Sequence, residues 1–320
     1  MKNRAWFLLF VVILLPACSS FWNARPPDVL QELNSGGSIV AFNQSGSLLA
    51  SGDWKGWVIL WRVPEGRSTR RWDARDGTVN GLAFLDQGSR LLSAGYDGAL
   101  AIWDLKGRLV ERIETPSPVM HLVADDAAGM VVTGHKDGVV RTWSKEGLQL
   151  LASYPLHDGA VKAVALQPGS GTIASSGNDG NVFVLRDGED ARELESPPTD
   201  AWALLFSPDG ERLFGSGWFR LYRWDLDGGE LLSMPTEHHG LIRSLHFSPS
   251  ADYLASISRQ TDSAVLFLDP ETGEVISRFQ KHALCGAYVA VSPDGRFLAT
   301  TSDDATVRIW DLGKEPGGDD

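Results

Sequence analysis

The chain has 320 residues, of which 43% are hydrophobic and 22% are charged, and its formal net charge is −12. Its 41 acidic side chains outnumber 29 basic ones, and it has no basic run that could neutralise phosphates, which argues against nucleic-acid binding. The 34 glycines and 12 tryptophans indicate many tight turns and recurrent large aromatic side chains. This composition favours repeated short strands over helices. Two cysteines cannot form a disulfide framework.

The N-terminal segment, residues 1–17, is predicted to be a targeting sequence. Lys2 and Arg4 precede an uninterrupted apolar run of 11 residues, 5–15. Such a run is too short for a mature membrane span and is typical of a signal-peptide core. It ends in Leu15-Pro16-Ala17-Cys18, which resembles the lipobox of bacterial lipoproteins. The resemblance implies cleavage before Cys18 and acylation of that cysteine.

Two other interpretations of this segment stay open, an ordinary secretory peptide cut near Ala17 and an uncleaved anchor. On the lipoprotein resemblance, residues 18–27 are the lipidated cysteine and a membrane tether. Ser19 after the cysteine, in place of an aspartate, favours a bacterial outer membrane, with the chain facing the periplasm. Loss of residues 1–17 leaves 27 basic and 41 acidic side chains, so the net charge becomes −14. Cys285 is then the remaining cysteine, and stability must come from packing.

One β-rich segment recurs along residues 28–312 and ends each time in Trp-Asp or an equivalent pair. Each unit opens with an apolar strand such as Val161–Leu166, and a polar turn such as Ser292-Pro293-Asp294-Gly295 follows it. The anchor residues are 39 to 44 positions apart, and such a period with four strands per unit is typical of a β-propeller. The anchors are Trp61, Trp103, Trp143, Leu185, Trp224, Leu268 and Trp310.

These units resemble the WD-repeat family, and Val307-Arg308-Ile309-Trp310-Asp311-Leu312 is nearly its consensus. The resemblance covers seven units and implies an all-β fold, a seven-bladed propeller of four-stranded antiparallel blades. Residues 313–320, Gly-Lys-Glu-Pro-Gly-Gly-Asp-Asp, do not have the pattern of a strand and are expected to form an acidic flexible tail. The last unit therefore lacks a fourth strand after Leu312. The segment Asp28–Leu33 is therefore expected to supply the missing fourth strand of the last blade. That pairing closes the ring and removes a free sheet edge.

A set of polar residues recurs at fixed distances before the anchors. An aspartate lies six residues before the anchor in five units, and a histidine lies 28 residues before it in two. We expect a buried His–Ser/Thr–Asp–Trp chain of hydrogen bonds, complete in unit seven, that locks turn to strand. A His/Ser/Asp trio also occurs in hydrolases, but its recurrence by repeat position favours a structural role. The set comprises Asp97, Trp103, Asp137, Trp143, His157, Asp179, His238, Asp262, His282, Thr300, Asp304 and Trp310.

Units one and five depart from this pattern, because Lys55 and Trp218 occupy the aspartate position. These units lie nearly opposite each other in a seven-bladed ring, so Trp54 and Trp218 are expected to flank the mouth of the central channel. Large aromatics in polar loops are typical of interface anchors. The alternative is that they plug the channel or pack on neighbouring loops. The candidate partner-binding residues, all in second-to-third-strand turns of one face, are Trp54, Tyr96, His135, Lys136, Asn178, Trp218, Phe219 and Arg259.

Enzyme motifs are absent from the sequence, including the P-loop, the nucleophile elbow and the H-E-x-x-H zinc motif. His238, His239 and His246 have no carboxylate at ligand spacing, so neither a metal nor a cofactor is expected. WD-repeat proteins are mostly non-catalytic interaction platforms. The resemblance therefore implies a lipid-anchored scaffold for protein or peptide partners of the cell envelope, of undetermined oligomeric state. The alternative is an enzyme or small-molecule binder at the channel mouth, which converging carboxylates or histidines outside the repeat set would favour.

Overall fold

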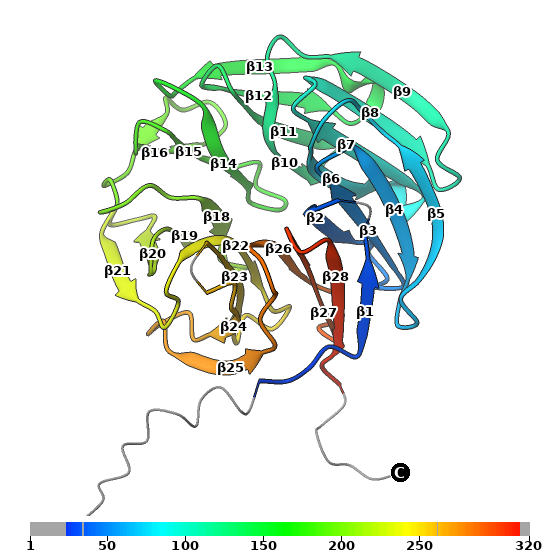
Figure 1. The fold of residues 1–320 in the computed structure, drawn as a ribbon. Helices are drawn as coiled ribbons and strands as arrows, with labels where there is room; N and C mark the ends of the chain where they lie inside the picture. Colours follow the sequence, from blue (N-terminus) through cyan, green and yellow to red (C-terminus); the bar gives the residue numbers. More distant parts are fainter. Residues whose placement is uncertain (1–23, 34, 261, 314–320) are drawn as a thin grey trace, which may run out of the picture.

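The computed structural model describes residues 24–33, 35–260 and 262–313. These residues form seven four-stranded antiparallel sheets, arranged as blades around a central axis (Figure 1). Helical structure in the described ranges is limited to two 3-10 turns, η1 (Asp86–Gly88) and η2 (Glu146–Leu148). The predicted all-β, seven-bladed propeller is confirmed. Cys18 and the predicted targeting segment lie outside the described residues.

Six blades each take four consecutive strands, ordered from the channel outward, and the seventh takes its outermost strand from the N-terminal part of the chain. Blades one to three comprise β2 (Gly37–Phe42), β3 (Leu48–Asp53), β4 (Trp57–Arg62), β5 (Arg67–Asp73); β6 (Val79–Leu85), β7 (Arg90–Gly95), β8 (Ala99–Asp104), β9 (Leu109–Glu114); β10 (Val119–Asp125), β11 (Met130–His135), β12 (Val139–Ser144) and β13 (Leu150–Pro155).

Blades four and five comprise β14 (Val161–Leu166), β15 (Ile173–Gly177), β16 (Val182–Leu185), β17 (Arg192–Glu193); β18 (Ala203–Phe206), β19 (Arg212–Ser216), β20 (Arg220–Asp225) and β21 (Leu231–Pro235). Blades six and seven comprise β22 (Leu241–Phe247), β23 (Leu254–Arg259), β24 (Val265–Leu268), β25 (Val275–Phe279); β26 (Gly286–Val291), β27 (Phe297–Ser302), β28 (Thr306–Asp311) and β1 (Val29–Glu32).

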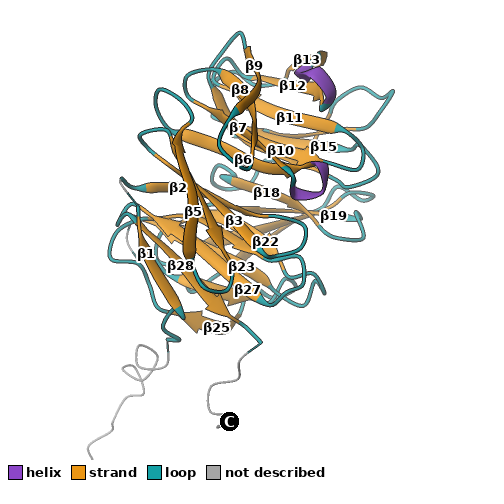
Figure 2. Ribbon diagram, turned by 90° about the vertical axis from the view of Figure 1, so that its right-hand side faces the viewer, coloured by secondary structure: helices purple, strands orange, loops and turns teal. Residues whose placement is uncertain are grey.

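The antiparallel meander divides the connections between two faces of the disc, which Figure 2 shows from the side. We call the upper face the one that carries the second-to-third-strand turns and the connections from each outer strand to the next blade. Its second-to-third-strand turns include residues 54–56, 96–98, 136–138, 178–181, 217–219 and 303–305. The lower face carries the first-to-second-strand and third-to-fourth-strand turns. No described residues form a helix long and apolar enough to cross a membrane.

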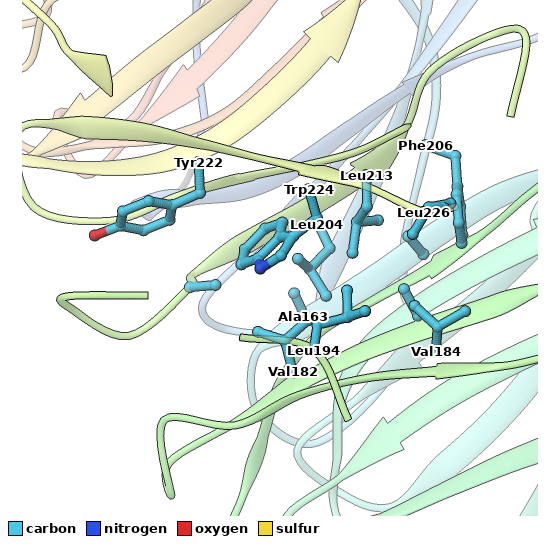
Figure 3. Close-up of a cluster of buried hydrophobic side chains, with 13 residues drawn as sticks. Ala163, Val182, Val184, Leu194, Leu204, Phe206, Leu213, Tyr222, Trp224 and Leu226 are labelled. Carbon is cyan, nitrogen blue, oxygen red and sulfur yellow. The ribbon is translucent and has the colours of Figure 1, made fainter. Parts of the chain in front are cut away.

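The hydrophobic core is a series of layers between adjacent blades. Figure 3 shows the layer between blades four and five, where Val182 and Val184 on β16 face Leu204 and Phe206 on β18. The anchor Trp224 lies in this layer and is fully buried. Successive residues of a strand point to opposite sides of the sheet, so each blade contributes apolar side chains to the layers on both of its sides. This explains why the strands read as continuous apolar runs.

Turn glycines allow close backbone approach on the upper face. Gly56 has a φ of +91°, and a Cβ at this position would lie 1.9 Å from the carbonyl oxygen of Arg75. Gly138 has a φ of +81°, and a Cβ there would lie 2.1 Å from the carbonyl oxygen of His157. Both positions therefore require glycine for its conformation and its lack of a side chain.

The ring is closed as predicted, by antiparallel pairing of β1 with β28. Val29 pairs with Ile309 and Glu32 pairs with Thr306, within the expected segment Asp28–Leu33. The closure extends further upstream, because the backbone N–H of Arg25 donates to the carbonyl oxygen of Arg278 on β25 (3.1 Å). Arg25, expected in the tether, thus bridges blades six and seven.

Candidate functional site

The innermost strands open on the upper face with a shared irregularity. In six blades the ladder between the first and second strands shifts register near its start, after the first residue in five blades and after the second in blade six. Such a bulge leaves one residue unpaired and re-aims its side chain. We call the resulting set the bulge ring; its members are Ser38, Asn80, Met120, Lys162, Arg243 and Ala287, with Trp202 directly before β18 at the corresponding place in blade five.

Side chains of the bulge ring connect neighbouring innermost strands. The hydroxyl of Ser38 donates to the carbonyl oxygen of Val79 (2.6 Å), and Nδ2 of Asn80 donates to the carbonyl oxygen of Val119 (2.8 Å). Each bond satisfies a polar side chain at the channel wall. At Ser38 and Asn80 the ring therefore links the innermost strands of blades one to three by polar contacts.

The part of the ring in blades four to six has a different composition, with two cations directed at one indole. Nζ of Lys162 lies 4.9 Å from the ring centroid of Trp202, and Cζ of Arg243 lies 5.8 Å from it. Both distances are within the range of cation–π attraction. Lys162 is buried and also forms an ion pair with Asp200. We call Lys162, Asp200, Trp202 and Arg243 the Trp202 cluster.

Arg243 is the member of the Trp202 cluster that has no acidic partner among the described residues. Its guanidinium Nη1 donates to the carbonyl oxygen of Trp202 (3.3 Å), and no described carboxylate forms an ion pair with it. Burial lowers the pKa of Arg243, the charge of Arg259 lowers it further, and Tyr288 opposes the shift. Burial, and next the charge of Arg243, lower the pKa of the neighbouring His121 to about 4. The channel wall therefore holds a neutral histidine beside an uncompensated arginine at neutral pH.

The channel below the mouth contains a cavity of about 490 Å³ with a largely apolar wall. His246 lines this cavity, and Nδ1 of its ring is 2.8 Å from the carbonyl oxygen of Phe247. Burial lowers the pKa of His246. Among the described residues, no group of three or more His, Cys, Asp or Glu side chains is placed to hold a metal ion. The cavity is lined by apolar side chains such as Val40, Leu82, Leu122, Val123, Ala290 and Val291.

The upper-face aromatics predicted to bind partners are solvent-exposed. The side chains of Trp54, Tyr96 and Phe219 are 42%, 45% and 46% exposed. Nζ of Lys136 donates to the hydroxyl of Tyr96 (2.7 Å), so two of the candidates from blades two and three are in contact. Trp218 is half-buried, and its ring centroid lies 5.6 Å from that of Phe219. The candidates thus form separate small groups on one face.

Asn178 and Arg259 lie on the same face but differ in their contacts. Asn178 is exposed, and its backbone N–H donates to the carbonyl oxygen of Ala160 (2.9 Å). Nη2 of Arg259 forms an ion pair with Asp303 (3.0 Å). Arg259 is therefore already neutralised, in contrast to Arg243.

His135 is the exception, and its predicted place on the outward surface is wrong. The side chain is 0% exposed. Its Nδ1 donates to the carbonyl oxygen of Ser117 (2.9 Å), and its Nε2 accepts from the hydroxyl of Thr133 (2.7 Å). Nε1 of Trp143 donates to the same hydroxyl (2.8 Å). His135 is the last residue of β11 and points into the blade, where it takes the histidine position of the polar chain.

The polar chain of unit seven is present in three of its four predicted members. Nδ1 of His282 lies 3.0 Å from Oδ2 of Asp304, and its Nε2 accepts from the hydroxyl of Thr300 (2.8 Å). Trp310 corrects the prediction, because its Nε1 donates to the carbonyl oxygen of Arg25 (3.1 Å). The N-terminal closure places this acceptor beside the indole.

Other blades carry versions of the same chain. His157 contacts Asp179 (3.1 Å) and Ser175 (2.9 Å), and its anchor position is a leucine. His238 accepts from the hydroxyl of Ser256 (2.8 Å) and lies 3.6 Å from Asp262. In blade three, Asp137 instead forms an ion pair with Arg141 (2.8 Å).

Blade two has an arginine in place of the histidine, which the sequence interpretation missed. Nη1 of Arg75 donates to Asp97 (2.6 Å), and its Nη2 donates to the hydroxyl of Ser93 (2.8 Å). Nε1 of Trp103 donates to the same hydroxyl (2.9 Å). Arg75 stands 28 residues before Trp103, the repeat position of the histidine. The spacing could have identified it if the residue type had not been restricted to histidine.

The bulge ring was also missed, although the sequence contains a sign of it. Lys162 stands alone as a charge within the apolar strand Val161–Leu166. Lys162 is the second residue and Arg243 the third residue of an innermost strand. A polar residue that recurs at this strand position could have indicated the channel mouth.

Comparison with known proteins agrees with this architecture. The family model described as "WD domain, G-beta repeat" matches residues 66–104, 148–184 and 273–311. The chain is similar to the periodic tryptophan protein 2 homolog of Dictyostelium discoideum, with 26% identity over 85% of this chain and 30% of that protein. It is similar to WD repeat-containing protein 55 of Pongo abelii, with 24% identity over 90% of this chain and 76% of the relative. It is also similar to human pre-mRNA-processing factor 17, with 25% identity over 86% of this chain and 50% of that protein.

The chain therefore contains WD40 repeats and has WD-repeat proteins as relatives, two of which it spans for half of their length or less. These relatives are eukaryotic, and the name of one assigns it to pre-mRNA processing. The cells of these organisms have no periplasm. This finding contradicts the predicted location in a bacterial cell envelope, anchored in the outer membrane and facing the periplasm, and that prediction is wrong by this comparison.

Proposed function

We propose that this WD-repeat propeller is a non-catalytic scaffold that binds protein or peptide partners through its upper face. The observation that carries the proposal is the exposure of Trp54, Tyr96 and Phe219 on that face. Large aromatic side chains supply much contact area at a small cost in conformational entropy, which makes them frequent anchors of interfaces. Similarity to WD-repeat proteins supports the same function.

The turns that carry these aromatics are held by the blades. The backbone N–H of Trp54 donates to the carbonyl oxygen of Gly36 (3.0 Å), and that of Tyr96 donates to Thr78 (3.2 Å). The backbone N–H of Phe219 donates to Gly240 (3.1 Å). An interface built on such pre-ordered turns loses little entropy when it binds. This rigidity supports a role as a platform.

Selection from a displayed library of random peptides tests the proposal. Peptides chosen on the full chain should bind the Trp54→Ala/Phe219→Ala double variant about tenfold or more weakly, as expected when interface anchors are removed. The matched control is Leu109→Ala/Leu151→Ala, which removes two exposed apolar side chains from outer strands of blades two and three. Equal binding by all three proteins, or failure of the wild type to select any peptide, would contradict the proposal.

Residues 1–18 support a separate proposal, that Cys18 is acylated. It rests on the sequence Leu15-Pro16-Ala17-Cys18 and on the apolar run before it. Metabolic labelling with an alkyne-bearing fatty acid should mark the full chain. The label should disappear in Cys18→Ser and persist in Cys285→Ser, since Cys285 lies within the propeller. Labelling that survives Cys18→Ser overturns this proposal and leaves the scaffold proposal unaffected.

A further inference from the structure

The Trp202 cluster has an excess positive charge at the mouth of the channel. Lys162 is paired with Asp200, whereas Arg243 contributes a second cation that has no described carboxylate within ion-pair distance. The chain as a whole carries a net charge of −12. A partly buried cation without a counterion is unfavourable for folding, because desolvation is not offset by a partner. We therefore expect that the counterion of this cation is supplied by a bound partner.

The surroundings of Arg243 are suited to a peptide. Arg243 follows Ile242 on β22, and Leu241 of the same strand forms an isolated β-bridge with Trp218. This bridge holds the exposed ring of Phe219 close to the strand that carries Arg243. On the other side, the connection into blade seven presents Leu284, which is also exposed. Exposed apolar side chains from blade five and from the connection into blade seven thus flank blade six, which carries the uncompensated Arg243.

We propose that Arg243, supported by Trp202, binds the carboxylate of an aspartate or glutamate in a partner peptide whose flanking apolar residues contact Phe219 and Leu284. This inference rests on the proposed scaffold function and names the chemistry of the partner. The planar guanidinium offers a fork of N–H donors that matches a carboxylate. Contact with the face of Trp202 holds the guanidinium in place, so less entropy is lost on binding.

The charge distribution favours a single carboxylate over a polyanion. Asp200 within the cluster is paired with Lys162, and Asp303 is paired with Arg259. A nucleic acid needs several cations to neutralise successive phosphates. One uncompensated arginine in a protein of net charge −12 can pair with one carboxylate but cannot neutralise a series of phosphates. An acidic peptide is therefore favoured over RNA.

The test selects displayed random peptides on the full-length wild type and on Arg243→Met. Peptides selected by the wild type should be enriched in Asp and Glu next to apolar residues, and the enrichment should vanish for Arg243→Met. A synthetic peptide with the selected sequence should bind Arg243→Met about tenfold or more weakly, as expected from loss of a charge-assisted hydrogen bond. Arg243→Lys retains the positive charge and should lose less affinity for this peptide than Arg243→Met does. The matched control is Arg223→Met, since Arg223 is partly buried, ion-paired with Glu271 and outside the channel.

The outcomes separate this inference from the scaffold proposal. Peptides without acidic enrichment, bound equally by wild type and Arg243→Met, overturn the inference and leave the scaffold proposal standing. Failure to select any peptide overturns both. Titration with glutarate tests whether a free carboxylate is sufficient for binding, and titration with a short poly(U) RNA tests whether a nucleic acid binds instead of a peptide. Arg243-dependent binding of either at the affinity of the peptide also overturns the inference.

Discussion

Two arginines on the upper side of this propeller, Arg75 and Arg243, show how similar residues differ in role. Both are partly or fully buried beside a tryptophan. Arg75 bonds to Asp97, to the hydroxyl of Ser93 and to the carbonyl oxygen of Ala99. Arg243 bonds to one carbonyl oxygen and has no described acidic partner. A buried charge that is paired with a carboxylate stabilises a blade, whereas one without an acidic partner is available to a ligand.

The largest effect is expected at Arg75. Arg75→Met leaves Asp97 and Ser93 without their main partner inside blade two, and the free energy of unfolding should fall by about 3–5 kcal/mol, the usual cost of breaking a buried ion pair from one side. Urea-induced unfolding followed by tryptophan fluorescence measures this change. A loss below about 1 kcal/mol, within the range of surface substitutions, would show that Arg75 is not part of a closed network.

The next effect concerns the pH dependence of stability in blade three. Burial lowers the pKa of His135 to about 4, from an ordinary value of 6.5. The unfolded chain therefore takes up a proton below pH 6.5 that the folded blade excludes until about pH 4. Stability should accordingly decrease as the pH falls through this window, by up to about 3 kcal/mol from this histidine.

Unfolding of His135→Asn across the same pH range checks this assignment. The variant is less stable at neutral pH, because Ser117 and Thr133 lose hydrogen bonds. Its stability should nevertheless depend less steeply on pH between 6.5 and 4 than that of the wild type. Identical slopes would mean that His135 does not exclude a proton in the folded state.

The smallest effect on stability is expected at Arg243. Arg243→Met replaces an uncompensated cation by an apolar side chain of similar length, so the free energy of unfolding should change by less than about 1 kcal/mol or increase. Thermal unfolding alongside Arg75→Met gives the direct comparison. A loss as large as that of Arg75→Met would place Arg243 among the structural residues and remove the contrast on which its proposed role depends.

Much of the fold could be predicted from the sequence, because the repeat is local. The spacing of Trp61, Trp103 and the other anchors predicted seven blades, and the lack of a strand after Leu312 predicted closure by the N-terminal segment. The same regularity failed at His135 and Arg75. His135 stands where the alignment expected a turn, and Arg75 differs in type from the histidine that was sought. Hydrogen-bond geometry accepts either residue where the acceptors and donors fit.

The candidate site was less predictable, since it depends on contacts between blades. The exposure of Trp54 and Phe219 followed from their positions in turns, but the contact of Lys162 and Arg243 with Trp202 joins blades four, five and six. Residues 41 positions apart in the chain, such as Trp202 and Arg243, meet at one point of the channel wall. A period in the sequence shows which residues share a position in the repeat and carries no information on which of them touch.

The number of blades, their strands and the closing of the ring could be predicted from the chain's residues alone, because each follows from short-range alternation and a period of about 40 residues. Which polar side chains find hydrogen-bond partners depends on contacts between blades. The register shifts near the start of six innermost strands each leave one residue unpaired at the channel mouth. The curvature of the ring then places such residues of neighbouring blades together. Whether an arginine is structural or free to bind is therefore settled by what the adjacent blades bring within hydrogen-bond distance.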